Sequence, residues 1–220
     1  MFDYNFHWSP VFKSLPDLLA ASLMTLQVAA LSMVLGVLIG LALSVIRLTV
    51  RGPLYWFATA WIETARNTPA LFQLFFFGFG LGAFGWHLSP YMIVLAGLTF
   101  NNAGYLAENF RGGFQAVPET QMRAARSLGM SLWQTYTRIL VPQVLRIVYY
   151  PMTNQLVWAV LMSSLGMLVG FRELSGETQF FASRTYRVFE YFAIAALIYY
   201  VLVKFILMAS RLLAAKLFRY

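Results

Sequence analysis

The sequence has 220 residues, of which 60% are hydrophobic and only 11% are charged, and its formal net charge is +8. A soluble domain carries about 25% charged residues, so this composition argues against a soluble protein and indicates an integral membrane protein. The basic residues lie between long apolar runs and form no continuous stripe, which argues against nucleic-acid binding. The absence of cysteine excludes disulfides, thiolate nucleophiles and cysteine metal sites.

Five apolar runs with almost no charged residues predict five transmembrane helices. About 20 apolar residues in a helix cross the bilayer, and a charge at the centre costs roughly 2.5 to 3.5 kcal/mol. A glycine-rich stretch, GFGLGAFGWHLSP, separates the second run from the third. The runs cover residues 22–46, 70–84, 91–107, 147–171 and 191–213. We therefore expect an all-α integral membrane protein with a single transmembrane domain over residues 1–220.

The basic residues predict the orientation of these helices, because lysine and arginine resist translocation across the membrane. An odd number of spans places the two termini on opposite sides. Four basic residues would lie on the side of the N-terminus: Lys13, Arg172, Arg184 and Arg187. The other twelve would lie on the opposite side: Arg47, Arg51, Arg66, Arg111, Arg123, Arg126, Arg138, Arg146, Lys204, Arg211, Lys216 and Arg219. We therefore expect the N-terminus outside and the C-terminus in the cytoplasm.

One helix-prone insert, residues 111–142, lies between the third and fourth runs and contains PETQMRAARSLGMSLWQTYTRILVP. The proline that opens this stretch suits the first turn of a helix. Gly129 stands where a left-handed residue ends a helix. Ser131 and Gln134 have the spacing of a capping box, which begins a second helix directed towards Pro142. Two short helices joined at a glycine are therefore predicted on the cytoplasmic side.

The insert also carries apolar side chains: Met122, Leu128, Met130, Leu132 and Trp133. A solvated loop is one interpretation, since helix caps and scattered arginines are ordinary there. An amphipathic helix pair would more naturally dock on lipid head groups or on a partner protein.

Several motifs resemble one family. The stretches RAARSLG and ILVPQ resemble the EAA loop of permease subunits in ATP-binding-cassette importers of type I. ETARNTPALFQLFF, YLAENFRGGFQAVPETQ and MSSLG resemble other segments of the polar amino acid permeases, so the likeness covers about residues 63–165. The resemblance implies that two permeases form a pathway and that a coupling helix in the insert docks on a dimer of separate ATPase subunits. It assigns the coupling surface to Arg123, Ala124, Ala125, Gly129, Ile139 and Pro142.

One departure from the family concerns the partner permease. Arg123 stands where the family's loop usually has a glutamate. We therefore expect a second, non-identical permease with the more usual loop, and hence a heterodimer. The resemblance also implies a soluble binding protein that delivers the substrate outside. Residues 172–190 combine both charge signs with aromatic side chains, and they are either its landing surface or a plain loop.

No motif in the sequence carries catalysis. There is no Gly-Lys pair anywhere and hence no phosphate-binding loop, so a separate subunit must hydrolyse ATP. His7 and His87 have no neighbours at ligand spacing. We therefore expect no catalytic residue, no cofactor and no metal in this chain.

Polar side chains inside the apolar runs are candidates for the substrate path, because burying one without a partner costs a few kcal/mol. They are Gln73, Asn101, Asn102, Asn154, Gln155, Ser163 and Ser164. The alternative for each is a hydrogen bond between helices. We prefer this alternative for the serines, and the two interpretations carry equal weight for the Asn-Asn and Asn-Gln pairs.

Charged residues are scarce near this path. The fourth run has no carboxylate to neutralise a cationic substrate, which favours a neutral or acidic amino acid. Glu63 with Arg66, and Glu108 with Arg111, stand three residues apart at helix ends and are expected to pair locally.

The resulting hypothesis is a multi-pass permease subunit in the bacterial inner membrane, embedded in lipid, for ATP-driven uptake of a polar amino acid. A secondary transporter or channel subunit is the alternative, although it would normally show internal repeats or intramembrane charges. A membrane enzyme would need a nucleophile, a metal or an acid–base group. Uptake driven by a proton gradient through this chain alone would favour the secondary transporter.

Overall fold

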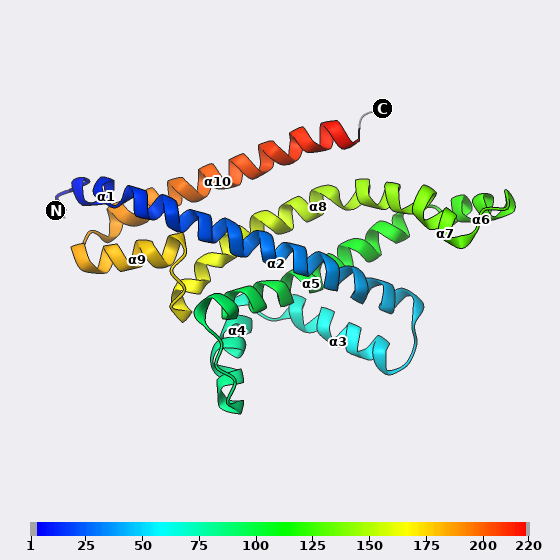
Figure 1. The fold of residues 1–220 in the computed structure, drawn as a ribbon, viewed down its shortest axis with the longest axis horizontal. Coiled ribbons are helices and arrows are strands. Elements are labelled where there is room, and N and C mark those ends of the chain that lie inside the picture. Colours follow the sequence, from blue (N-terminus) through cyan, green and yellow to red (C-terminus); the bar gives the residue numbers. More distant parts are fainter. Residues whose placement is uncertain (1–3, 219–220) are drawn as a thin grey trace.

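The computed structural model describes residues 4–218, and within that range the secondary structure is helical without a strand (Figure 1). The short π and 3-10 segments extend the helices that precede them. In chain order the helices are α1 (Ser9–Lys13), α2 (Leu15–Thr49), α3 (Pro53–Asn67), α4 (Ala70–Phe75) with its extensions Phe76–Gly80 and Leu81–Phe84, α5 (Pro90–Ala116), α6 (Glu119–Ser127), α7 (Leu132–Thr135) with Tyr136–Leu140, α8 (Val141–Met162) with Ser163–Val169, α9 (Leu174–Thr185) and α10 (Val188–Leu217). Arg219, one of the twelve basic residues expected on the cytoplasmic side, lies outside the described residues.

Among the described residues, three helical stretches are long and apolar enough to cross a membrane: Leu15–Thr49, Leu132–Val169 and Val188–Leu217. They contain the first and fifth predicted runs and all but the last two residues of the fourth. The second run is a shorter apolar helix, Ala70–Phe84, and the third lies within α5. In Figure 1, α2, α5 and α8 extend along the long axis, whereas α4 leaves them at a steep angle. The predicted all-helical membrane fold is confirmed.

The helix that contains α7 and α8 continues through Pro142, towards which the second helix of the insert was predicted to run. Proline has no N–H and cannot donate to the carbonyl group four residues earlier. A π turn, Tyr136–Leu140, directly precedes α8. Its wider hydrogen-bond spacing accommodates the missing donor. The proline therefore marks a local change of helix type and not the end of the helix.

Two glycines allow α2 and α5 to pack closely. A Cβ atom added at Gly36 would lie 2.6 Å from Asn102 Cβ, and one added at Gly40 would lie 2.9 Å from the Ala103 carbonyl oxygen. Lipid chains are as apolar as leucine, so helices in a membrane associate through this kind of close van der Waals contact. The small-residue spacing of GVLIG therefore marks the α2–α5 contact.

Helix α10 is the least buried of the long helices, because only 6% of its apolar window is buried, against 39% for α2. Hydrogen bonds hold it to α8: the Tyr149 hydroxyl donates to the Ser210 carbonyl at 2.8 Å, and the Thr153 and Ser210 hydroxyls lie 2.8 Å apart. Its exposed apolar side chains include Leu197, Tyr200, Val201, Phe205, Met208 and Leu212. Such a surface suits contact with lipid chains.

The segment before α1 is tied to the start of α10. Tyr4 donates a hydrogen bond to the Glu190 carboxylate, which raises the pKa of Tyr4 because only the neutral phenol can donate. The His7 N–H donates to Glu190 Oε1 at 2.9 Å, and Arg187 donates to the Asn5 carbonyl at 2.7 Å. The chain's first described residues therefore form one unit with this end of α10.

Candidate functional site

The loop between α5 and α8 consists of α6 and α7, joined at Gly129. This residue has a φ of 80°, a left-handed conformation that favours glycine. Its N–H donates to the Arg126 carbonyl at 3.1 Å. Ser131 and Gln134 then begin α7 with reciprocal capping bonds of 3.2 and 2.8 Å. The predicted helix break at Gly129 and the predicted cap at Ser131 are confirmed, whereas the second helix is not short, because α7 continues into α8.

The two small residues of the predicted coupling surface have different environments. Ala124 is exposed, whereas Ala125 is only 5% exposed and its carbonyl accepts the Met130 N–H at 3.2 Å. Ala125 therefore holds the loop together and is not on its outer surface. A large side chain at Ala125 would disturb the loop itself.

The other coupling candidates are spread along the loop. Arg123 is exposed and pairs with Glu119, one turn earlier in α6, at 3.0 Å. Ile139 is half-buried in the π turn, and Pro142 is exposed at the start of α8. They belong to α6, the π turn and the start of α8, which lie at one end of the bundle (Figure 1).

Two large apolar side chains dominate the exposed surface of this loop. Leu128 is 83% exposed and Trp133 is 77% exposed. Trp133 also lines a cavity of about 870 Å³ between the loop and the C-terminal end of α2, where Val45 and Leu48 contribute to the opposite wall. Apolar groups exposed together in this way favour contact with a partner.

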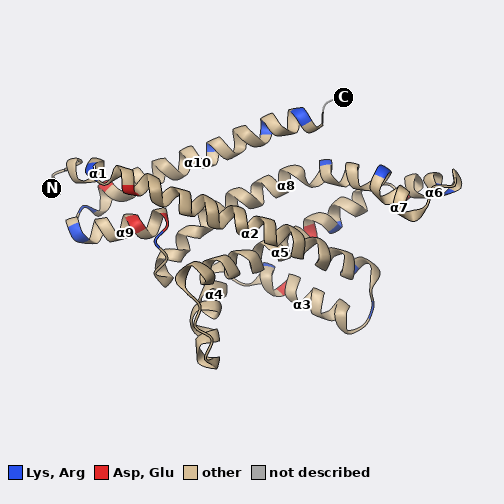
Figure 2. Ribbon diagram, in the orientation of Figure 1, with Lys and Arg blue, Asp and Glu red and all other residues tan. Residues whose placement is uncertain are grey.

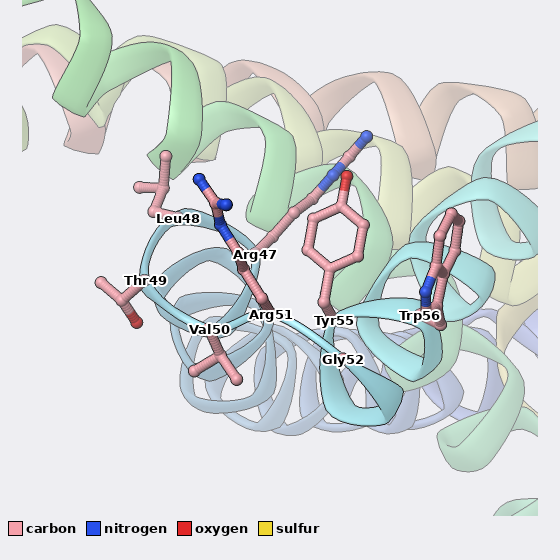
Figure 3. A pocket seen from close by; sticks show the side chains of 8 residues that line it. All are labelled: Arg47, Leu48, Thr49, Val50, Arg51, Gly52, Tyr55 and Trp56. Atoms are coloured by element: carbon pink, nitrogen blue, oxygen red, sulfur yellow. The ribbon is translucent and has the colours of Figure 1, made fainter.

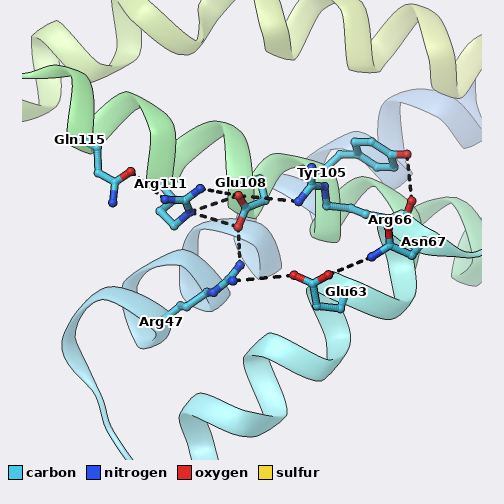
Figure 4. A network of polar contacts seen from close by, with 8 residues as sticks. All are labelled: Arg47, Glu63, Arg66, Asn67, Tyr105, Glu108, Arg111 and Gln115. Carbon is cyan, nitrogen blue, oxygen red and sulfur yellow. Dashed lines mark hydrogen bonds and ion pairs between the residues drawn. The ribbon is translucent and has the colours of Figure 1, made fainter.

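A network of ion pairs joins α2, α3 and α5 near the start of the loop (Figure 4). Glu108 accepts from Arg111 at 2.7 Å and from Arg47, and it pairs with Arg66 at 3.7 Å. Arg47 also lies 3.8 Å from Glu63. The local Glu108–Arg111 pair was predicted, whereas Arg66 pairs across helices with Glu108 and not with Glu63. The reason is that Glu108 is better shielded, with a side chain 15% exposed against 51% for Glu63.

Gln73 and Asn101, two of the substrate-path candidates, are buried and hold the end of α3. The Gln73 amide donates to the Ala65 carbonyl at 2.9 Å and to Thr68. The Asn101 amide donates to the same carbonyl at 3.2 Å and to Gln73 Oε1 at 3.0 Å. Within the described residues, Asn101 Oδ1 is buried without a partner. This cluster joins the ends of α3 and α4 to α5.

Asn102 and Gln155 form a second buried cluster, between α2, α5 and α8. The Asn102 amide donates to Ser32 Oγ at 3.2 Å, and the Gln155 amide donates to Asn102 Oδ1 at 2.9 Å. The interpretation as a hydrogen bond between helices therefore describes both residues.

Ser163 leads to a buried carboxylate that the sequence did not reveal. Glu173 is fully buried and accepts from Ser163 at 3.3 Å, Thr25 at 2.8 Å, Tyr199 at 2.6 Å and the Ser175 N–H at 2.7 Å. These donors come from α2, α9, α10 and the 3-10 segment after α8. The available signal was the position of this glutamate directly before a helix, where side-chain oxygens cap free N–H groups.

Asn154 and Ser164 are the two path candidates that make no polar contact to another helix in the described part of the chain. Asn154 is exposed and has no hydrogen-bond partner within residues 4–218. Ser164 is half-buried and donates only to the Leu161 carbonyl, in the preceding turn, at 2.6 Å. The side of α8 that carries Asn154 also exposes Tyr150 and Leu161. In the part of the chain that the structure describes, no group of three acidic or histidine side chains could hold a metal ion.

Residues 32–219 match the family described as binding-protein-dependent transport system inner membrane component. The chain belongs to this family. It is 35% identical over 178 residues to the probable glutamine ABC transporter permease protein GlnM of Bacillus subtilis (strain 168), covering 81% of this chain and 82% of the relative. It is 27% identical over 214 residues to the arginine transport system permease protein ArtQ of the same organism, covering 97% and 98%.

A solved structure has the same fold. It is the crystal structure of an amino acid ABC transporter with histidines, and it matches with a TM-score of 0.90 at 29% identity, covering 97% of this chain and 100% of that chain. The protein is therefore a multi-pass permease subunit of an ABC transporter in the inner membrane. Such permeases do not hydrolyse ATP, which is the role of a partner ATPase, and they work with a binding protein.

Proposed function

We propose that this permease forms half of the translocation pathway of an ATP-driven uptake system for amino acids. The named relatives support this class of substrate, since they transport glutamine and arginine by name, and the solved transporter is one for amino acids. The observation that carries the proposal is the loop of α6 and α7, which presents exposed apolar residues at one end of a membrane helix bundle.

The topology that fits this role has five spans, with the N-terminus outside and the C-terminus in the cytoplasm. The three long apolar helices, the shorter helix Ala70–Phe84 and α5 would supply the spans. Figure 2 supports the orientation, because lysine and arginine are frequent around α6, α7 and the C-terminal end of α10. The middle of α2 has no charged residue.

The loop over residues 111–142 would couple the permease to the ATPase dimer. Leu128 and Trp133 are exposed enough to enter an apolar groove of the ATPase. Gly129 sets the angle between α6 and α7, so the pair would move as one body with the ATPase. Arg123, which already pairs with Glu119 within the same helix, supports a second permease with a different loop, and hence a heterodimer.

The substrate would pass the face of α8 that carries Asn154, with Ser164 further along. Exposed polar groups in an apolar span are costly against lipid, which favours a polar path or a partner helix there. The buried candidates Gln73, Asn101, Asn102, Gln155 and Ser163 would instead hold the wall of that path in place. No carboxylate lies on α8 itself, which favours a neutral or acidic amino acid.

Affinity purification of the tagged chain from its native membrane tests the proposal. The expected result is co-purification of an ABC ATPase and a second, different permease, and ATP-dependent amino acid uptake after reconstitution with the binding protein. Recovery of homodimers only would contradict the heterodimer. A chain that is isolated alone and still moves solute without ATP would instead support the secondary transporter.

A further inference from the structure

A cavity of about 500 Å³ lies at the turn between α2 and α3, outside the residues assigned to coupling or to the path (Figure 3). Its walls include Arg47, Arg51, Tyr55 and Trp56. In Figure 3 the side chains of Arg51, Tyr55 and Trp56 project from the turn towards the same side. Two cationic and two aromatic side chains with polar tips therefore surround one open space.

The backbone of the turn creates this arrangement. Gly52 has a φ of 95° and a ψ of −155°, a region that is essentially restricted to glycine. The turn reverses the chain between α2, which ends at Thr49, and α3, which begins at Pro53. Arg51, which lies between the end of α2 and Gly52, is thereby placed beside the first turn of α3.

Several hydrogen-bond donors at this cavity are unused. Among the described residues, the Arg51 guanidinium has no hydrogen bond or ion pair, and the Tyr55 hydroxyl and Trp56 indole N–H have no acceptor. Arg47 is engaged with Glu108 and Glu63, so it adds positive potential without being free. The free donors match the acceptor oxygens of a phosphate group.

An apolar track leads away from the cavity along α2. Leu48 lines the cavity, and Val45 and Leu41 follow at helical spacing on the same side, each of them about 40% exposed. A free phosphate has no apolar group that could contact this track, whereas a lipid would place its acyl chains on it. Exposed Trp56, at 68%, is also typical of side chains at the membrane–water boundary.

We propose that this cavity binds the phosphodiester head group of an anionic phospholipid in the inner leaflet. Arg51 pairs with the phosphate, Tyr55 and Trp56 donate hydrogen bonds to the head group, and the acyl chains follow Leu48, Val45 and Leu41. The site rests on the proposed topology, which places this end of α2 at the cytoplasmic surface. Because Arg47 belongs both to the cavity wall and to the ion pairs of Glu108, a bound lipid stabilises the junction of α2, α3 and α5.

Native mass spectrometry of the purified transporter complex tests the site. The complex, in mild detergent, is mixed with equal amounts of phosphatidylglycerol and phosphatidylcholine, and the lipids retained on it are counted. The wild-type complex is expected to prefer phosphatidylglycerol, and Arg51→Gln is expected to lower the ratio of the two lipids roughly fivefold. Arg211→Gln is the matched control, because Arg211 is also exposed and has no partner among the described residues.

An unchanged ratio in Arg51→Gln, or an equal fall in Arg211→Gln, overturns the proposal. Two further arms separate lipid from free phosphate. Leu48→Gln is expected to reduce phosphatidylglycerol retention, and inorganic phosphate at millimolar concentration is expected not to displace the lipid. Displacement by phosphate together with no effect of Leu48→Gln would assign the cavity to a free anion and overturn the lipid site.

The topology is tested separately with Arg51→Cys, which would be the only cysteine of the chain. Labelling of this cysteine by a membrane-impermeant maleimide only in inside-out vesicles supports the cytoplasmic position. Labelling only from the outside would contradict the topology and with it the inner-leaflet site. Cytoplasmic labelling without any preference for phosphatidylglycerol would overturn the lipid site alone.

Discussion

At the scale of single residues, Glu108 has more ion-pair partners than any other acidic residue in the part of the chain that the structure describes. Arginines from α2, α3 and α5 converge on its carboxylate, which is mostly shielded from solvent (Figure 4). Removing this charge would leave three guanidinium groups close together. The resulting loss of folding stability is larger than for an exposed ion pair, because the attraction and the hydrogen bonds are both lost at a partly buried site.

Glu108→Gln is therefore expected to destabilise the permease by about 2 kcal/mol, which lowers the Tm by roughly 4 to 8 °C for a chain of this size. Thermal unfolding of the purified complex measures the shift. Glu119→Gln is the control, since its pair with Arg123 is exposed on both sides and should contribute less than about 1 kcal/mol. Equal Tm shifts for the two variants would show that the network around Glu108 contributes no more to stability than the exposed Glu119–Arg123 pair.

At the scale of elements, the positions of glycine decide how helices meet. Gly129 joins α6 and α7 in a left-handed conformation, and apart from the glycine itself and its two chain neighbours no described residue has an atom within 4 Å of the place that a Cβ would occupy, so its role is conformational. Gly36 has an ordinary helical conformation, and its role is to let α2 approach α5. Glycine therefore acts through its backbone conformation at position 129 and through its small size at position 36.

Gly129→Pro is expected to uncouple transport, because proline fixes φ near −65° and removes the N–H that donates to Arg126. Amino acid uptake by the reconstituted transporter should fall by about tenfold or more, while the amount of permease in the membrane stays unchanged. Gly112→Ala, at a helical glycine of α5 with open space around it, should keep full uptake. Normal uptake in Gly129→Pro would show that coupling does not depend on the left-handed turn between α6 and α7.

Gly36→Ala is expected to lower the free energy of unfolding by about 1 to 3 kcal/mol, because the new methyl group would lie 2.6 Å from Asn102 Cβ and force the helices apart. A lower Tm and less permease in the membrane would report it. Ala30→Val enlarges an exposed position of the same helix and should have little effect. If the two variants unfold alike, the α2–α5 contact does not depend on small residues.

At the scale of the whole molecule, the distribution of charge along the long axis is the main feature. Basic side chains lie around the loop of α6 and α7, and a second charged group lies around α1 and α9 at the other end (Figure 2). Lipid chains can cover the uncharged middle, including the exposed side of α10. In the proposed topology, the two charged ends face water on opposite sides of the membrane.

Cysteine labelling checks this arrangement directly, since the natural chain has no cysteine. Ser183→Cys, at an exposed position of α9, should react with an impermeant maleimide added to intact cells. Ser127→Cys, exposed at the end of α6, should react only in inside-out vesicles, and Ala30→Cys, within α2, in neither. Reaction of both exposed cysteines from the same side would contradict an odd number of spans.

The sequence by itself determined the elements whose cause is local. Apolar runs predicted the membrane helices because each charged residue adds its own cost of burial in lipid, and the Gly129 turn and the Ser131 cap depend on neighbours within a few positions. Only the tertiary structure decided the rest. Glu173 accepts hydrogen bonds from four segments of the chain. Arg66 pairs with Glu108 and not with Glu63, which is closer in the sequence. Ala125 is buried, whereas Ala124 beside it is exposed. Such choices depend on which helices meet and at what angle, and this information is not contained in the spacing of residues along the chain.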